Sequence, residues 1–341
     1  MKQDIPNSKN FCGGNFKDWL EVNLLERCNA NCEWCIEKKG YHPKHHATVD
    51  EIATAAINSG KKNIALLGGE PLLYKDIQKL IRFLRKAGKN VTVTTNGYLL
   101  TEEYVYANLQ GLSNINISIH HWQMQKNEEI TKVFIDAFEL KKSIGHLKKS
   151  LGVSVRMNCN LISGYIDCKK TIYQYIDWAK YIGADKVRFA ELKDAEESFV
   201  DLTDIFGTEY GINGDPFLYG CNSDCHILDM PVNFRQMCGL QTNKRPRPIN
   251  PKQEKKQVLY YDGKIYDGWQ IMKEIKMNVD NTFLIKQLLN AKTGEKLNDA
   301  ELDDLLYLIK SIVDDSVEKS MTQYKAEVIE KIRYTDTSCA Y

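Results

Sequence analysis

The sequence predicts an α/β protein whose parallel sheet closes part of a (β/α)6 TIM-like barrel. Between residues 18 and 192, short apolar runs of strand length alternate about six times with segments of helical periodicity. Such alternation favours parallel strands joined by right-handed crossovers, with each helix covering the sheet. Because ligands of these sheets bind at the carboxyl ends of the strands, we expect the functional residues there.

The elements of this core follow one another in a regular order. Apolar runs predict strands at residues 20–25, 63–67, 91–95, 115–119, 153–159 and 186–192. Helical periodicity predicts helices at residues 49–57, 77–87, 130–142 and 171–182.

Three further parts surround the predicted core of residues 18–192. Residues 1–17 form an N-terminal segment, and residues 193–279 form a loop-rich auxiliary region. Within that region, VLYYDGKIY at residues 258–266 predicts a β-hairpin with Asp262-Gly263 as its turn. Residues 280–341 are expected to form a C-terminal helical segment with a flexible tail.

The composition excludes several classes of protein. The 46 Lys and Arg residues balance 45 Asp and Glu residues, so nucleic acid is not an expected partner. No apolar run reaches the ~20 residues of a membrane span, and the N-terminus lacks the apolar core of a signal peptide. We therefore expect a cytoplasmic protein without a membrane partner. In a reducing compartment, grouped cysteines indicate metal binding rather than disulfide bonds.

Three cysteines lie close together directly after the first predicted strand, as Cys28-x3-Cys32-x2-Cys35. Cysteine thiolates are the usual ligands of iron–sulfur clusters, and three of them leave one iron of a cubane open. A zinc loop or three buried thiols are the alternatives. Structural zinc usually takes four protein ligands, and this loop supplies no fourth one.

This motif, with Trp34 before its last cysteine, resembles the signature of the radical S-adenosylmethionine (SAM) superfamily. Three further segments match that family in order and spacing over roughly residues 18–192: Gly68-Gly69-Glu70-Pro71, Thr94-Thr95-Asn96-Gly97 and Asn116-Ile117-Ser118. The resemblance implies a [4Fe-4S] cluster on Cys28, Cys32 and Cys35 that binds SAM through its open iron. Reductive cleavage of SAM would give methionine and a 5′-deoxyadenosyl radical, which takes hydrogen from the substrate.

The resemblance also implies which residues contact SAM. The backbone of Gly68 and Gly69 is expected to approach the methionine moiety, because no Cβ intervenes. The segment through Glu70 and Pro71 would bind the SAM ammonium group. The remaining implied contacts are Trp34 and the backbone of Leu192 at the adenine, and Asn96, Ser118 and Asn158 at other polar groups of SAM. For Ser118 and Asn158, ordinary polar residues at strand ends are the alternative.

Other residues are candidates for substrate contacts. His120, His121 and Trp122 follow the fourth predicted strand, either at the substrate mouth or in a surface loop. Arg156 and Arg188 are expected to face the cavity or its rim, where an arginine binds carboxylate or phosphate. A structural ion pair is the alternative for either arginine.

A second cysteine group follows the core, as Cys221-x3-Cys225-x12-Cys238. It resembles the auxiliary-cluster region of SPASM and Twitch radical SAM proteins, which implies a second [4Fe-4S] cluster. In many of those proteins the hairpin ends in a ligand cysteine, whereas Trp269 stands near that place here. Structural zinc with His226 as a fourth ligand, or free thiols, are the alternatives.

The resemblance favours an enzyme that modifies a peptide, supplied with electrons by a low-potential donor such as flavodoxin or ferredoxin. Only 27 residues precede Cys28, so no leader-binding domain is expected. The alternative is a dehydrogenase, epimerase or cyclase of a sugar, cyclitol or nucleotide, although the chain lacks the terminal Gly-Gly of GTP-rearranging enzymes. A non-catalytic electron-transfer protein would not need the Gly68–Pro71 segment. RNA modification is supported only by the basic run of residues 244–256.

Overall fold

The computed structural model describes residues 16–192, 195, 197–212, 221–237 and 256–270. Apart from Tyr41–Lys44, these residues belong to one compact unit; a second unit comprises Tyr41–Lys44 and Ile271–Tyr341. The described part of the first unit is built on a sheet with the strand order β10-β9-β1-β2-β3-β4-β5-β6-β8-β7. The strands are β1 (Trp19–Asn23), β2 (Asn63–Leu67), β3 (Asn90–Thr95), β4 (Asn114–Ser118), β5 (Ser154–Asn160), β6 (Lys186–Ala190), β7 (Asn222–Ile227), β8 (Met230–Arg235), β9 (Gln257–Leu259) and β10 (Ile265–Asp267).

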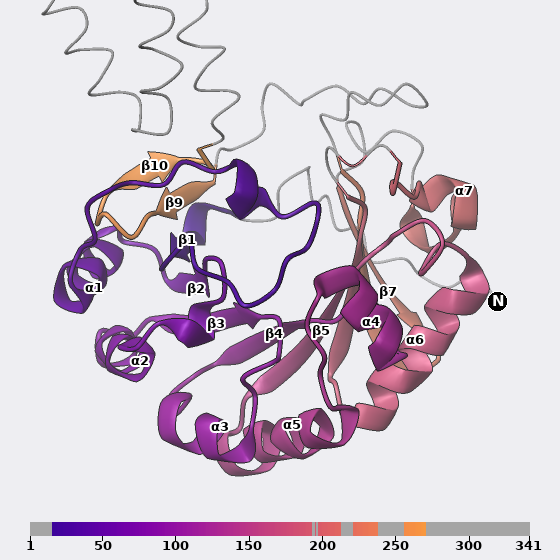
Figure 1. Cartoon of the computed structure of the whole chain (residues 1–341), viewed down its shortest axis with the longest axis horizontal. Helices are drawn as coiled ribbons and strands as arrows, with labels where there is room; N and C mark the ends of the chain where they lie inside the picture. The colour runs from indigo at the N-terminus through magenta and orange to yellow at the C-terminus, as the bar shows by residue number, and fades with distance from the viewer. Residues whose placement is uncertain (1–15, 193–194, 196, 213–220, 238–255, 271–341) are drawn as a thin grey trace, which may run out of the picture. The chain divides into compact units, whose positions relative to one another are not determined.

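All six predicted core strands are present, and each pairs in parallel with the next one along the chain. The α/β fold class with a parallel sheet is therefore confirmed. Helices cover the outer side of the curved sheet, as Figure 1 shows. They are α1 (Val49–Asn58), α2 (Ile77–Lys86), α3 (Glu102–Asn108), α4 (Met124–Thr131), α5 (Ala137–Leu151), α6 (Lys169–Ile182) and α7 (Leu202–Phe206).

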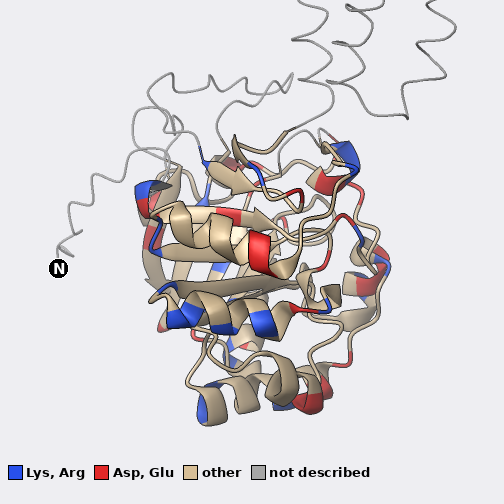
Figure 2. Ribbon diagram, turned by 90° about the vertical axis from the view of Figure 1, so that its left-hand side faces the viewer, with Lys and Arg blue, Asp and Glu red and all other residues tan. Residues whose placement is uncertain are grey.

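Side chains alternate between the two faces of the sheet, and β5 shows the pattern most clearly. Val155, Met157 and Cys159 are buried in the hydrophobic core under the helices. Arg156 and Asn158, between them, line a cavity on the inner face of the curved sheet. Acidic and basic side chains are mixed over the outer helices (Figure 2). The outer face of the sheet therefore provides the core, and its inner face is left to polar residues.

The prediction of one helix over residues 130–142 is wrong, because two helices occupy this region. Lys132 ends α4 in the left-handed backbone conformation, with φ +63°. Asp136 then caps α5 by accepting hydrogen bonds from the backbone of Phe138 and Glu139. Helix α3, which the sequence analysis did not predict, begins with a Thr101 cap.

The auxiliary region contains more regular structure than the sequence predicts. The hairpin is confirmed: β9 and β10 are antiparallel, and Gly263 in their turn has φ +82°. A second hairpin, β7–β8, was not predicted, because the sequence of β7 has no apolar run. Strand β8 pairs in parallel with β6, and β9 pairs in parallel with β1. Both hairpins thus extend the core sheet rather than forming a separate layer.

Two further predictions concern membrane-spanning helices and the C-terminal segment. Across the described ranges, no helix combines the length and apolarity needed to cross a membrane. The predicted helical segment of residues 280–341 lies outside the described residues.

Candidate active site

The loop that carries Cys28, Cys32 and Cys35 follows β1 and is held by two neighbouring segments. The backbone N–H groups of Gly69 and Glu70 donate to the carbonyls of Leu25 and Arg27, at 2.7 and 3.0 Å. On the other side, the Asn31 N–H donates to the Thr131 carbonyl of α4 at 2.8 Å. The cysteine loop is therefore fixed between the Gly68–Pro71 segment and α4.

The two glycines of this segment are required by a neighbour that the sequence analysis did not identify. A Cβ on Gly69 would lie 2.4 Å from the carbonyl oxygens of Glu26 and Arg27. A Cβ on Gly68 would lie 2.7 Å from the Leu25 carbonyl oxygen, and Gly68 has φ +138°. The backbone of the cysteine loop therefore occupies the space where a side chain at either position would lie, and the approach of both glycines to SAM stays a prediction.

Cys28, Cys32 and Cys35 are free thiols in this structure. Burial raises the pKa of Cys28, and burial together with the Cys35 and Cys28 thiols raises the pKa of Cys32 to about 11. Among the described residues, no three His, Cys, Asp or Glu side chains converge on a single metal ion. A cluster does not need such convergence, since each thiolate binds a different iron.

Two observations indicate that the residues of this loop can hold an iron–sulfur cluster. Three thiols in one short loop are the donor set that such a cluster uses. In addition, the Asn29 Nδ2 atom beside Cys28 is buried without a hydrogen-bond partner in the described structure. A buried N–H donor without an acceptor is costly, and an electron-rich group at the loop would satisfy it.

Glu70 is buried and joins the Gly68–Pro71 segment to the end of β3. Its Oε1 atom accepts from the Thr95 hydroxyl and the Leu72 N–H, at 2.7 and 3.0 Å, and its Oε2 atom accepts from the Asn96 N–H at 2.8 Å. Burial raises the pKa of this carboxyl group. These bonds give Glu70 a role in holding the Asn96 turn, and Pro71 begins the short 3-10 helix Pro71–Leu73 that follows.

Trp34 and Leu192, both implied at the adenine of SAM, lie together in the structure. Trp34 packs against a small apolar cluster of Ile130, Ile162 and Leu192. The Trp34 ring also meets the ring of His120 edge-on, with 5.6 Å between the centroids. One apolar surface is thus formed by residues of the cysteine loop, of α4 and of the carboxyl end of β6.

Ser118 and Asn158 are direct neighbours across the β4–β5 pair. The Asn158 side-chain oxygen accepts a hydrogen bond from Arg156 Nε at 2.9 Å, and Asn158 lines the inner cavity. Ser118 is not among the residues that line it. The structure therefore groups Asn158 with Arg156.

His120 and His121 are not among the residues that line this cavity, and their expected place at the substrate mouth stays a prediction. Both are buried, at 6% and 1% exposure, so the surface-loop alternative is wrong. Each accepts a backbone N–H at Nδ1, from Asn160 and Gln123 respectively. Burial lowers the pKa of each imidazole to about 4, which leaves both neutral at pH 7.

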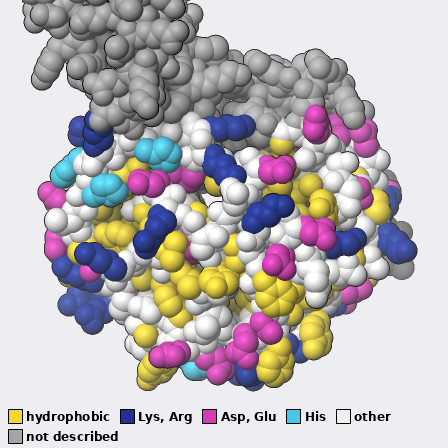
Figure 3. All heavy atoms as spheres, in the orientation of Figure 1, with side chains coloured by type: hydrophobic (Ala, Val, Ile, Leu, Met, Phe, Trp, Pro, Cys, Tyr) yellow, Lys and Arg dark blue, Asp and Glu magenta, His cyan; other side chains and the backbone are white. Residues whose placement is uncertain are grey.

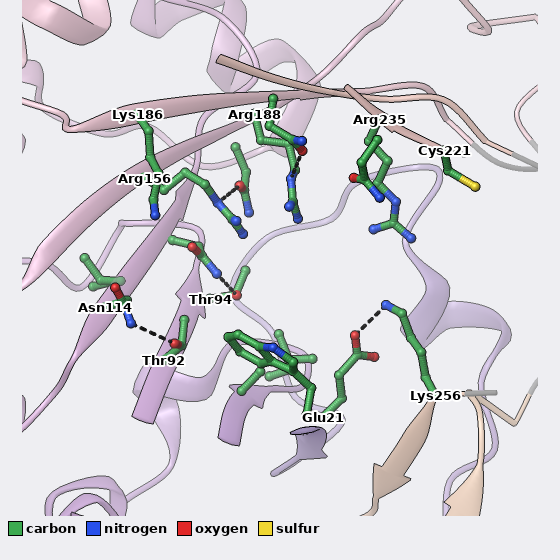
Figure 4. Close-up of a pocket in the computed structure, with 18 of the residues that line it drawn as sticks. Glu21, Thr92, Thr94, Asn114, Arg156, Lys186, Arg188, Cys221, Arg235 and Lys256 are labelled. Carbon is green, nitrogen blue, oxygen red and sulfur yellow. Dashed lines mark hydrogen bonds and ion pairs between the residues drawn. The ribbon is translucent and has the colours of Figure 1, made fainter. Parts of the chain in front are cut away.

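The inner face of the sheet encloses a cavity of about 580 Å³. Its lining includes the first residues of β1, β4, β5 and β6, so the cavity extends to the amino ends of these strands. We had expected the site at their carboxyl ends. Figure 4 shows its cationic side chains, which come from β5, β6 and β8 and from the residue before β9. They are Arg156, Lys186, Arg188, Arg235 and Lys256.

The three arginines have no carboxylate at ion-pair distance in the described structure. Arg188 Nε instead donates to the neutral Asn233 side chain at 2.7 Å, as Arg156 does to Asn158. Burial and the neighbouring arginines lower the pKa of Arg188 to about 9, and burial and Arg235 lower the pKa of Arg156 to about 10. The expectation that both face the cavity is confirmed.

The opposite wall of the cavity is neutral apart from one ion pair. Lys256 Nζ lies 2.6 Å from Glu21 Oε1, and the Trp269 indole N–H donates to Glu21 Oε2 at 2.6 Å. The rest of this wall carries hydroxyl and amide groups from β3 and β4: Thr92, Thr94, Asn114 and Asn116. On the face shown in Figure 3, acidic and basic side chains are mixed. In the cavity lining, five cationic side chains stand against two acidic ones, Glu21 and Asp224.

The second cysteine group is only partly described, because Cys238 lies outside the described residues. Cys221 lines the cavity and is disulfide-bonded. Cys225 is a free thiol that packs against the hydrophobic core, on the face of β7 opposite the cavity residues Asn222 and Asp224. Burial raises the pKa of Cys225 to about 12. The second cluster stays a prediction.

Residues 22–173 match the Radical SAM superfamily. A "GTP 3',8-cyclase" of Peptoclostridium acidaminophilum is 33% identical over 161 residues, which cover 44% of this chain and 48% of that protein. A "Probable GTP 3',8-cyclase" of Sulfolobus acidocaldarius is 26% identical over 309 residues, 82% of this chain and 92% of that protein.

A solved structure supports the fold. The crystal structure of Streptococcus suis SuiB has a TM-score of 0.51 at 17% identity, covering 76% of this chain and 60% of that one. The chain spans about half the length of the Peptoclostridium relative. With the three-cysteine loop and the parallel sheet, the sequence match shows that residues 22–173 of this chain form a radical SAM domain.

Proposed function

We propose that this chain is a radical SAM enzyme that acts on a polyanionic small molecule of the nucleotide class. One observation carries the proposal: Arg156, Arg188 and Arg235 extend into one cavity, and none of them has a carboxylate at ion-pair distance in the described structure (Figure 4). Asp224 also lines this cavity and acts on Arg156 and Arg188 at longer range, so the cationic groups remain in excess. Buried cations without anions are unfavourable, and a bound anion relieves the cost. Arginine is also the side chain best shaped for phosphate.

The size and polarity of the cavity support a small molecule. A volume of about 580 Å³ lies within the roughly 300–1,000 Å³ of small-molecule sites. One wall is cationic, and the facing wall offers hydroxyls and amides from Thr92, Thr94, Asn114 and Asn116. This division suits a ligand with an anionic end and a neutral hydrogen-bonding end, as a nucleotide has.

The relatives point the same way. Of the two relatives described above, one is named "GTP 3',8-cyclase" and the other "Probable GTP 3',8-cyclase". Their name supports a nucleotide in preference to the peptide that the sequence analysis favoured. The cluster and SAM, when bound, supply the radical that takes hydrogen from the substrate. The residues of this chain hold the anion, exclude water from the inner face and orient the ligand.

The experiment is a substrate test on the anaerobically reconstituted protein with a low-potential reductant. GTP, other nucleoside triphosphates and a set of peptides are compared for stimulation of 5′-deoxyadenosine release. We expect stimulation by a nucleotide, with deuterium from the labelled nucleotide appearing in 5′-deoxyadenosine. Replacing Cys28, Cys32 and Cys35 together with Ala is expected to abolish release. Stimulation by peptides alone would contradict the proposed substrate class, and release by the triple variant would contradict the radical SAM assignment.

A further inference from the structure

Asn96 lies directly after β3, with its side-chain amide toward the cysteine loop. Its Nδ2 atom is 2.8 Å from Asn29 Oδ1 and 3.9 Å from Cys28 Sγ. The backbone N–H of Ala30 lies 3.3 Å from the same sulfur. Two N–H groups, one from the loop itself and one from β3's end, therefore face the sulfur of Cys28.

The orientation of the Asn96 amide is fixed by its neighbours. The backbone N–H of Tyr98 donates to Asn96 Oδ1 at 3.0 Å, so the oxygen faces Tyr98 and the NH2 group faces the cysteine loop. The Asn96 backbone is held in turn by the buried Glu70 carboxyl group, which accepts its N–H at 2.8 Å. Asn96 thus presents an N–H donor to Cys28 from a rigid support.

The chemistry of the sulfur changes when Cys28 ligates iron. As a thiol, Cys28 faces Asn29 Oδ1 as a weak donor at 4.0 Å. As a thiolate ligand it has no proton and only accepts hydrogen bonds. Cluster reduction adds one electron, supplied by the low-potential donor, and increases the negative charge on the ligated sulfurs. A hydrogen bond to such a sulfur stabilises the reduced state more than the oxidised state and raises the reduction potential.

We propose that Asn96 is a positioning residue that tunes the cluster: its Nδ2–H group donates to the Cys28 thiolate and raises the reduction potential of the cluster. This inference rests on the cluster that the radical SAM family implies, and it is independent of the proposed nucleotide substrate. It differs from the SAM contact that the sequence resemblance implies for Asn96, because the effect is present before SAM binds.

The test measures the midpoint potential of the cluster by EPR-monitored titration without SAM, at matched iron content. Asn96→Ala removes the donor, and Asn96→Asp also adds negative charge beside Cys28. We expect the potential to become more negative in Asn96→Ala and more negative still in Asn96→Asp. Asn90→Asp is the matched control, because Asn90 begins the same strand, roughly 20 Å away at about 3.3 Å per residue. Its potential should equal that of the wild type.

Potentials equal to wild type in both Asn96 variants, with four irons retained, would overturn the proposal. If both variants lose the cluster, a measurement on the wild type still tests the proposal. Pulsed EPR of the reduced cluster, in protein labelled with ¹⁵N in the asparagine side chains, should show a weak nitrogen coupling. The proposal would also be overturned if the wild type lacks that coupling. It would likewise be overturned if Asn96→Ala keeps the coupling, because the nitrogen would then be that of Asn29.

Discussion

Arg156 donates through Nε to Oδ1 of Asn158, 2.9 Å away and two residues further along β5. The partner is a neutral amide, so it holds the guanidinium in place without cancelling its charge. Arg188 is held in the same manner by Asn233, at 2.7 Å. The cavity therefore combines fixed arginine geometry with an excess of positive charge, since Asp224 and Glu21 are its acidic lining residues against five cationic ones. This combination supports the proposed anion site over a structural ion pair.

Asn158→Asp keeps the acceptor for Arg156 but places a carboxylate inside the cavity. We expect inorganic triphosphate to bind roughly tenfold more weakly or worse, because the new charge neutralises Arg156 and repels the ligand. Isothermal titration calorimetry without SAM measures this. Asn63→Asp is the control, since Asn63 also accepts through Oδ1, from Asn90 at 3.1 Å, and does not line the cavity. Equal affinity in wild type and Asn158→Asp would contradict the anion site.

Arg188→Gln removes one cation from the same wall. A hydrogen bond to a charged group contributes about 1.5–3 kcal/mol, so we expect KM for the proposed nucleotide substrate to rise roughly 10- to 100-fold. Arg82→Gln, on the exposed face of α2, removes the same charge outside the cavity and should leave KM unchanged. A similar KM in both variants would show that Arg188 does not touch the substrate.

The sequence predicts much of the core and part of this site, for a physical reason. In β5, arginine and asparagine occupy alternate positions between buried apolar residues. That period of two places Arg156 on the inner face without knowledge of the tertiary structure. The same pattern identifies Arg188 in β6. The cysteine loop is predicted for a different reason, because its three cysteines lie close together in the sequence.

The residues that were missed depend on contacts distant in sequence. Arg235 enters the cavity only because β8 pairs with β6, and β8 follows a strand without an apolar run. Glu21 was not singled out, because its partners Lys256 and Trp269 follow it by more than 200 residues. The absence of a carboxylate at ion-pair distance from the arginines in the described structure is likewise a property of the assembled sheet and cannot be derived from spacing.

Gly69→Ala tests the contact between the Gly68–Pro71 segment and the cysteine loop. Its Cβ would lie 2.4 Å from two carbonyl oxygens of that loop, so the backbone must shift. We expect the variant to lose most of its cluster iron on reconstitution. Gly145→Ala is the control, because a Cβ at this position in α5 meets no atom within 4 Å, and it should stabilise the helix by up to about 1 kcal/mol. Full iron content in Gly69→Ala would contradict the assigned contact.

His120 makes stability depend on pH. Burial lowers its pKa from 6.5 to about 4, so the unfolded chain binds more protons between these values. The stability is fully present above pH 6.5 and falls as the pH drops toward 4, by up to about 3 kcal/mol. Urea unfolding of the wild type at pH 7.5 and 5 measures the loss. His120→Gln should reduce it, whereas His45→Gln, at an exposed position, should not. An unchanged pH dependence in His120→Gln would assign the loss to other groups.

The predicted second cluster on Cys221, Cys225 and Cys238 would require two changes in the described structure. Cys221 is disulfide-bonded and cannot ligate iron until that bond is reduced. Cys225 faces the hydrophobic core, so its thiol must turn away from the core to join a cluster at the cavity. Strand β7 is an edge strand, paired only with β8 among the described strands, which is the place in the sheet where such a change costs least.

The measurement is an iron and sulfide count with Mössbauer spectroscopy on the Cys28, Cys32 and Cys35 triple Ala variant, reduced and reconstituted anaerobically. We expect roughly four irons per chain, as one cubane requires. Adding Cys225→Ala should lower this count, and adding Cys168→Ala, an exposed free thiol, should not. A folded triple variant without iron would disprove the second cluster. Zinc in its place would favour a structural site, with the exposed His226 as the next residue to replace.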